Sequence, residues 1–174
     1  MIRPKSAVVM MEEALLPATY EPLMLETFLA APVLSWMGRH LLAEGVQRLF
    51  LACDPRFADK ARSQLPPELP AVISDRREDL LSFLDTPDTV LVLTRSALPL
   101  AEAGTGFAYA APGRELREVW RERLSNAVQG AELVSGWLPV YGPETLAELE
   151  EVFRSRGLGP EELVPGGNSE SNKK

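Results

Sequence analysis

Two stretches, SAVVMM at residues 6–11 and LAAPVL at residues 29–34, decide the fold of this chain. The first has the length and the unbroken apolar character of a buried strand. The second opens a helix, because Pro32 suits a first helical turn and Gly45 stands where a helix C-terminus favours positive φ. We therefore expect a strand at residues 6–11 and a helix over residues 32–44.

The rest of the chain alternates between strand-like and helix-like segments. The expected strands lie at residues 48–53, 71–74, 89–93, 106–110 and 132–140. The expected helices lie at residues 56–64, 77–84, 114–127 and 143–156. Strands that alternate with helices build βαβ units around a parallel sheet. We therefore predict an α/β fold with three layers and a mostly parallel central sheet.

The size and composition of the chain limit its organisation and location. One domain is expected over residues 1–164, since 174 residues can enclose a single hydrophobic core. The polar stretch at residues 165–174 predicts a disordered tail. Cys53 is the only cysteine, which excludes an internal disulfide and favours a reducing, cytoplasmic setting.

The charge, hydropathy and histidine content of the chain argue against several classes of partner and ligand. The formal net charge is −7 and no block of lysine and arginine occurs, so we expect no nucleic-acid partner. No apolar stretch is long enough to span a bilayer, so we expect no membrane partner. Because His40 is the only histidine, a histidine-based metal cluster is excluded.

Several segments follow one another in an order known from one enzyme family. Residues 7–10 are similar to a strand A-V-I-L, and residues 22–34 are similar, without a gap, to P-K-V-L-H-P-L-A-G-K-P-M-L. Residues 90–93 are similar to a strand V-L-V-L, and residues 140–150 to V-N-D-R-V-Q-L-A-E-A-E. The chain thus resembles the UDP-N-acetylglucosamine pyrophosphorylase (uridyltransferase) domain of the nucleotide-diphospho-sugar transferase family. The resemblance implies a nucleotidyltransferase fold of the GT-A, Rossmann-like type.

The phosphate-binding residues that the resemblance implies are missing from this chain. In the family, a G-x-G-T-R turn lets backbone N–H groups approach the triphosphate, and an arginine and lysines neutralise its charge. Glu13 and Leu15 stand here at the glycines, Pro17 at the arginine, and Leu23 and Ala31 at the two lysines. The glutamate adds repulsion, the leucine adds a side chain, and the proline removes both a charge and an N–H donor.

The metal-binding positions have changed in the same way. The family uses an aspartate and an asparagine to hold a Mg²⁺ that bridges the phosphates. Ser96 stands near the position of the aspartate, with Arg95 beside it, and Tyr141 stands at the asparagine. No other G-x-G-x-R or G-K-[S/T] motif occurs in the chain. We therefore expect no catalytic residue and no cofactor, with Mg²⁺ needed only if a transferase activity persists.

These losses predict a degenerate, non-catalytic domain that acts through protein–protein association in a regulatory or scaffolding role. The apolar segment 15–29 is either the interface for a partner protein or a second copy, or a cover over the vacated cleft. Two alternatives stay open. The domain could bind a nucleotide or nucleotide sugar without metal at the carboxyl ends of the strands. It could also be a transferase with rebuilt chemistry, which would need basic residues such as Arg95 near Ser96 and Tyr141.

Other polar side chains have an ordinary structural interpretation. His40 lies on the apolar face of its helix and Cys53 ends a buried strand, so we expect both to pack rather than react. Glu12 and Glu13 are either an acid/base pair or, more commonly, part of a solvated loop. The arginines of residues 114–127 alternate with glutamates, which is typical of an exposed helix face rather than of a phosphate site.

Overall fold

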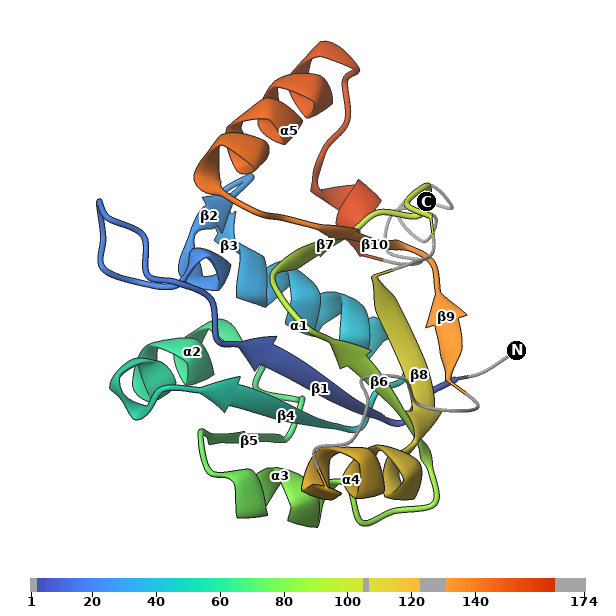
Figure 1. Ribbon diagram of the computed structural model, residues 1–174. Helices are drawn as coiled ribbons and strands as arrows, with labels where there is room; N and C mark the ends of the chain where they lie inside the picture. Colours follow the sequence, from blue (N-terminus) through green and yellow to red (C-terminus); the bar gives the residue numbers. More distant parts are fainter. Residues whose placement is uncertain (1–2, 105–106, 123–130, 165–174) are drawn as a thin grey trace.

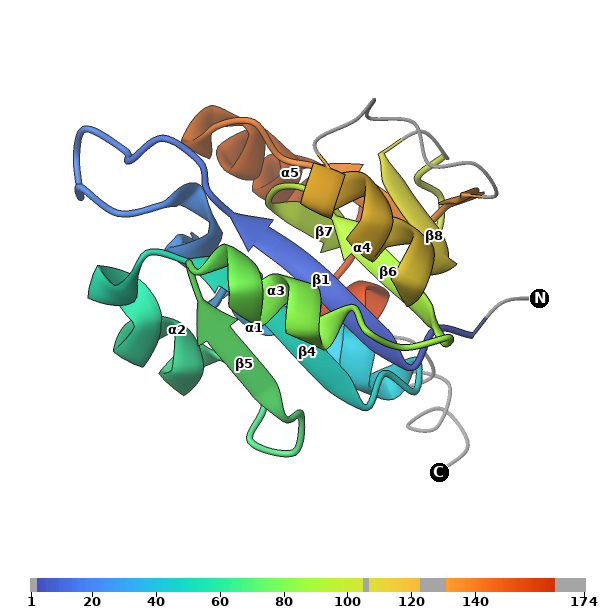
Figure 2. The same ribbon diagram turned by 60° about the horizontal axis from the view of Figure 1, so that its bottom comes forward.

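The apolar run at residues 6–11 forms the central strand of a six-stranded sheet (Figures 1 and 2). The structure is a computed structural model and describes residues 3–104, 107–122 and 131–164. The sheet has the order β5-β4-β1-β6-β8-β9, in which the first four strands are parallel and β8 runs antiparallel to both of its neighbours. These strands are β1 (Ser6–Met11), β4 (Arg48–Cys53), β5 (Ala71–Ser74), β6 (Thr89–Leu93), β8 (Ala108–Pro112) and β9 (Glu132–Val134).

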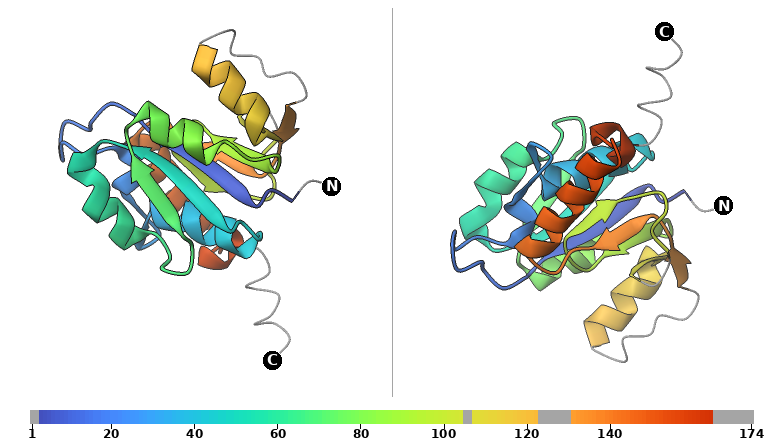
Figure 3. Two further views of the ribbon diagram at one scale, coloured as in Figure 1. Left: turned by 90° about the horizontal axis from the view of Figure 1, so that it is seen from below. Right: turned by 90° about the horizontal axis from the view of Figure 1, so that it is seen from above.

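Helices cover both faces of the sheet, which gives the expected three layers (Figure 3). Alternate residues of β1 face opposite sides, so that Ala7, Val9 and Met11 enter one core and Val8 enters the other. The first core packs against α1 (Val33–Ala43), α2 (Ala58–Gln64) and α5 (Pro143–Ser155). The second packs against α3 (Arg77–Phe83) and α4 (Gly113–Glu122). The prediction of an α/β fold with a mostly parallel central sheet is thus confirmed.

Several short elements were not expected from the sequence. A two-stranded sheet pairs β7 (Ala97–Pro99) with β10 (Trp137–Pro139), and a second pairs β2 (Thr27–Phe28) with β3 (Ala31–Pro32). The described residues also include three short 3₁₀ helices, which are η1 (Leu23–Leu25), η2 (Pro55–Phe57) and η3 (Pro160–Leu163). The turn η2 takes the first residues of the helix expected at 56–64, and its cap is Asp54, whose side chain accepts a hydrogen bond from the backbone N–H of Arg56.

The single strand expected at residues 132–140 is wrong. The chain breaks at Gly136, whose φ is +93°, a conformation that glycine adopts without a steric penalty. Before the break β9 pairs with β8 in the large sheet, and after it β10 pairs with β7 in a small sheet.

Smaller differences concern the ends and faces of three elements. The strand expected at 106–110 is found at Ala108–Pro112, and residue 106 lies outside the described residues. Residues 123–127 of the helix expected at 114–127, and the tail expected at 165–174, also lie outside the described residues. On α5, Leu146 and Phe153 are buried, whereas Val152 is 42% exposed. No helix in the described part of the chain is long and apolar enough to cross a membrane.

Candidate functional site

The chain changes direction across the sheet between β1 and β6. From β1 it continues to β4 and β5 on one side, and it then returns to place β6 on the other side of β1 (Figure 2). In open parallel sheets, ligands bind outside the carboxyl ends of the strands at such a switch point. The loops that leave β1 and β6 here carry Glu13 and Ser96. The candidate site is therefore the crevice between these two loops.

Glu13 and Ser96 bond directly to each other across this crevice. The Oε2 atom of Glu13 accepts a hydrogen bond from the backbone N–H of Ser96 at 2.8 Å, and Oε1 accepts one from the Ser96 hydroxyl at 2.9 Å. Ser96 is fully buried. The carboxylate thus occupies both donors of Ser96 that could otherwise have bound an anion such as phosphate. Two residues that are 83 positions apart in the sequence are thus joined in one structural contact.

Arg95 and Tyr141 form a second contact at the same place. The Nε–H of Arg95 donates to the carbonyl of Val140 at 3.2 Å, and the guanidinium carbon lies 4.2 Å from the centre of the Tyr141 ring. This is the distance of a cation–π interaction. The nearest basic residue of the candidate site is therefore engaged with the neighbouring loop, although Tyr141 itself is 68% exposed.

A pocket beside the crevice, at the carboxyl ends of β1 and β4, is acidic. Its volume is about 370 Å³, and Glu12, Glu13, Asp54 and Asp75 are among the residues that line it. Arg56 also lines it but is paired with Asp54 at 3.0 Å, and this hydrogen bond lowers the pKa of Asp54. The excess of carboxylates disfavours a phosphate-bearing ligand in this pocket.

The other positions singled out by the resemblance do not converge on the crevice. Leu23 is buried in η1 and Ala31 in β3, and both belong to the core on the α1 side of the sheet. Pro17 is exposed in the loop after β1, and Leu15 makes an isolated β-bridge with Pro22 at the base of that loop. The structure brings Glu13 together with Ser96, and places Leu23 and Ala31 inside the core.

The apolar segment 15–29 divides into a buried and an exposed half. Leu23, Met24, Leu25 and Phe28 are buried in the core. The loop before them projects from the carboxyl end of the sheet (Figure 1) and carries Tyr20, which is 75% exposed. Most of the exposed residues of this segment therefore lie in the projecting loop.

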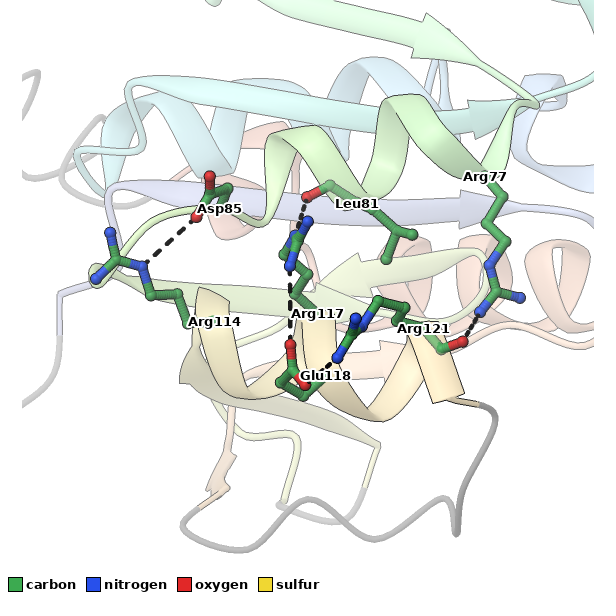
Figure 4. A network of polar contacts seen from close by, with 7 residues as sticks. All are labelled: Arg77, Leu81, Asp85, Arg114, Arg117, Glu118 and Arg121. Carbon is green, nitrogen blue, oxygen red and sulfur yellow. Dashed lines mark hydrogen bonds and ion pairs between the residues drawn. The ribbon is translucent and has the colours of Figure 1, made fainter.

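Hydrogen bonds from arginine side chains to backbone carbonyls link α4 and α3 (Figure 4). The Nε–H of Arg117 donates to the carbonyl of Leu81 at 3.1 Å. In the opposite direction, Arg77 of α3 donates to the carbonyls of Trp120 and Arg121. Arg121 pairs with Glu118 at 2.5 Å, three residues earlier on the same helix. These contacts give the arginines a structural role. The sequence predicted an exposed helix face, and it did not predict the hydrogen bonds between α3 and α4.

His40 and Cys53 pack as expected. The Nδ1 atom of His40 lies 3.3 Å from the carbonyl oxygen of Leu163, and its ring contacts Trp137 edge-on with 5.0 Å between the ring centres. Burial lowers the pKa of His40. The Cys53 thiol is buried and donates to the carbonyl of Asp54 at 3.2 Å. Burial, followed by the charges of Asp54 and Asp75, raises the pKa of this thiol to about 11, so that it is protonated and unreactive at neutral pH.

No group of three or more histidine, cysteine, aspartate or glutamate side chains among the described residues could hold a metal ion. No protein-family model matches the chain, and no curated protein matches it either.

Proposed function

We propose that this protein is a non-catalytic domain of the sugar-nucleotide pyrophosphorylase type that acts by associating with another protein. The observation that carries the proposal is the pair of hydrogen bonds from Ser96 to Glu13 at the switch point of the sheet. An enzyme that binds a triphosphate needs donors and positive charge at this place. Here the carboxylate of Glu13 accepts hydrogen bonds from both donors of Ser96 and adds a negative charge.

The backbone of Ala30 supports the relationship to that family. Residues 22–34 are similar, without a gap, to P-K-V-L-H-P-L-A-G-K-P-M-L, in which the glycine falls at Ala30. Ala30 has a φ of +69°, a conformation that glycine adopts freely and that is costly for alanine. A position that favours glycine in the structure thus coincides with a glycine in the family segment.

The loop after β1 supports association with another protein. The N–H of Leu16 donates to the carbonyl of Glu21 at 2.9 Å, the N–H of Tyr20 to the carbonyl of Leu16 at 2.7 Å, and Lys60 pairs with Glu21 at 2.7 Å. A loop that is ordered in advance loses little conformational entropy on binding. Tyrosine is among the residues that contribute most at protein interfaces. The loop therefore presents Tyr20, with Leu15 beside its base, in a form suited to recognition.

Photo-crosslinking tests this association. A photoreactive phenylalanine derivative replaces Tyr20, and a matched protein carries it in place of Val152, which is exposed on α5. We expect position 20, but not position 152, to give one defined crosslinked product in native lysate, either with another protein or with a second copy. The substitution Leu15→Ser should reduce that product. A monomeric sedimentation profile with no product specific to position 20 would contradict the proposal.

Ligand binding is tested separately by thermal unfolding in the presence of UTP, UDP-N-acetylglucosamine and uridine, each with and without Mg²⁺. We expect no increase in Tm, because Glu13 occupies the donors of Ser96 that a phosphate would need. A ligand that bound the folded state would stabilise it by RT ln(1 + [L]/Kd) and raise Tm. A saturable increase with uridine alone would instead favour a residual nucleoside site, and an increase that requires Mg²⁺ and UTP would favour a transferase.

A further inference from the structure

A second pocket lies far from the switch point, near the amino end of β1. Its volume is about 420 Å³, and it is bounded by the C-terminal half of α1 and by the segment from β9 to β10. Its apolar lining includes Leu41, Val46 and Leu91, each at most 4% exposed. A concave site of this size with an apolar lining and a few polar groups is typical of a ligand-binding pocket.

The charged side chains of this pocket are all acidic. Glu44 is the C-terminal capping residue of α1. Glu132 lies in β9 opposite Ala110 of β8, which in turn lies opposite Leu91 of β6. Both glutamates are exposed, and neither forms an ion pair with a described residue. No lysine or arginine of the described residues lines the pocket. The pocket therefore attracts cations and repels anions.

His40 and Trp137 add an acceptor and an aromatic wall. Because a carbonyl oxygen can only accept, the Nδ1 atom of His40 carries the hydrogen in its contact with Leu163, which leaves a lone pair on Nε2 of the neutral ring. Trp137 packs edge-on against this imidazole. Two carboxylates and an imidazole nitrogen are acceptors suited to an ammonium group, and the apolar and aromatic lining suits a hydrocarbon stem or ring.

We propose that this pocket binds an organic ammonium ion carried on an apolar body. The apolar body lies against Leu41, Val46 and Leu91, and the ammonium group lies near Glu44 and Glu132. The same chemistry is found in a free arylalkylamine and in a lysine next to an aromatic residue of a polypeptide. This site is separate from the crevice at Glu13 and does not depend on the function proposed above.

The single histidine makes the test direct, because only His40 contributes imidazole signals to an NMR spectrum of the protein. The probes are phenethylammonium, the neutral isostere 2-phenylethanol and the anion 3-phenylpropionate. We expect phenethylammonium to shift the His40 signals saturably, the alcohol to bind at least about tenfold more weakly, and the anion to cause no shift. Equal shifts with the cation and the anion, or no saturable shift with the cation, would overturn the proposal.

Matched variants locate the binding site. Glu44→Gln and Glu132→Gln keep the size of the side chains and remove their charges, so each should weaken phenethylammonium binding by about fivefold. Glu148→Gln changes an exposed glutamate of α5 that does not line the pocket and should leave binding unchanged. Circular dichroism verifies that each variant is folded. Equal affinity in all four proteins would contradict the assignment of the ammonium group to Glu44 and Glu132.

A capped lysine–phenylalanine dipeptide distinguishes the two sources of the ligand. It carries an ammonium group and a ring on a polypeptide backbone, with no free N-terminal amine. Tighter binding of the dipeptide than of phenethylammonium supports a polypeptide as the source, and the reverse order supports a free amine. Binding of neither compound would overturn the site.

Discussion

At the scale of single residues, Glu13 and Ser96 form the contact on which the interpretation of the switch point depends. Glu13→Ala would leave the N–H and the hydroxyl of buried Ser96 without their acceptor. We expect this variant to lose about 2 kcal/mol of unfolding free energy in urea denaturation. Glu13→Gln should lose about 1 kcal/mol, because an amide can keep both hydrogen bonds if the hydroxyl rotates to accept one.

The neighbouring Glu12 provides the control for this measurement. It is exposed, and none of the described residues forms an ion pair with it. Glu12→Ala should therefore change the unfolding free energy by less than about 0.5 kcal/mol. Equal losses in the Glu12 and Glu13 variants would show that the contact with Ser96 adds no stability.

The positive φ of Ala30 predicts a stabilising substitution. Ala30→Gly removes the steric cost of the left-handed conformation and should raise the unfolding free energy by about 1 kcal/mol, or Tm by about 3 °C. The same exchange at Ala147, an exposed position within α5, should lower stability by about 1 kcal/mol. A loss of stability at both positions, measured by calorimetry, would refute the prediction for Ala30.

The lowered pKa of His40 predicts a dependence of stability on pH. Burial disfavours the charged ring in the folded state, so the unfolded chain binds more protons below the ordinary pKa of histidine. Stability should therefore be complete above that pKa and fall as the pH drops through about 6.5. Urea denaturation between pH 5 and 7.5 should show this slope in the wild type and a weaker slope in His40→Gln. Identical slopes would mean that His40 is not the group responsible.

At the scale of elements, guanidinium–carbonyl contacts link α3 with α4 beside the apolar core that both helices share. Arg117→Ala removes the hydrogen bond to Leu81 and should lower the unfolding free energy by about 1 kcal/mol. Arg117→Lys should not restore it fully, because an ammonium group lacks the fixed donor geometry of the guanidinium. Arg154→Ala, which breaks an exposed pair with Glu151 on α5, should cost less than about 0.5 kcal/mol. Equal effects at positions 117 and 154 would contradict a specific role for Arg117.

The sequence predicts some elements more fully than others, for physical reasons. The strands β1, β4, β5 and β6 lie where they were expected, because each is a largely apolar run between turn-forming residues. The hairpin of β2 and β3 was missed because its turn residues, Leu29 and Ala30, have positive φ without being glycine or asparagine. The break at Gly136 was missed because a lone glycine is also compatible with a bulge inside a strand.

At the scale of the whole molecule, the sequence shows which residues stand at the positions singled out by the resemblance, but not which contacts these residues make. The identities of Glu13, Leu23, Ala31, Ser96 and Tyr141 can be read from the chain without any structure. The bond between Glu13 and Ser96 joins residues that are 83 positions apart, and it depends on the strand order that makes β1 and β6 neighbours. Local patterns carry no information about such a contact. The pocket at Glu44 and Glu132 was missed for the same reason.

We propose that no nucleotide binds in the crevice between the loops that follow β1 and β6. Phosphorus-31 NMR of UTP with Mg²⁺, titrated with the protein, tests this claim most directly, because the γ- and β-phosphorus signals respond to contacts with the phosphates themselves. We predict that the positions and widths of the signals match those recorded with an equal concentration of an unrelated protein. A saturable shift or broadening that requires this protein, and that changes in Glu13→Ala, would contradict the account.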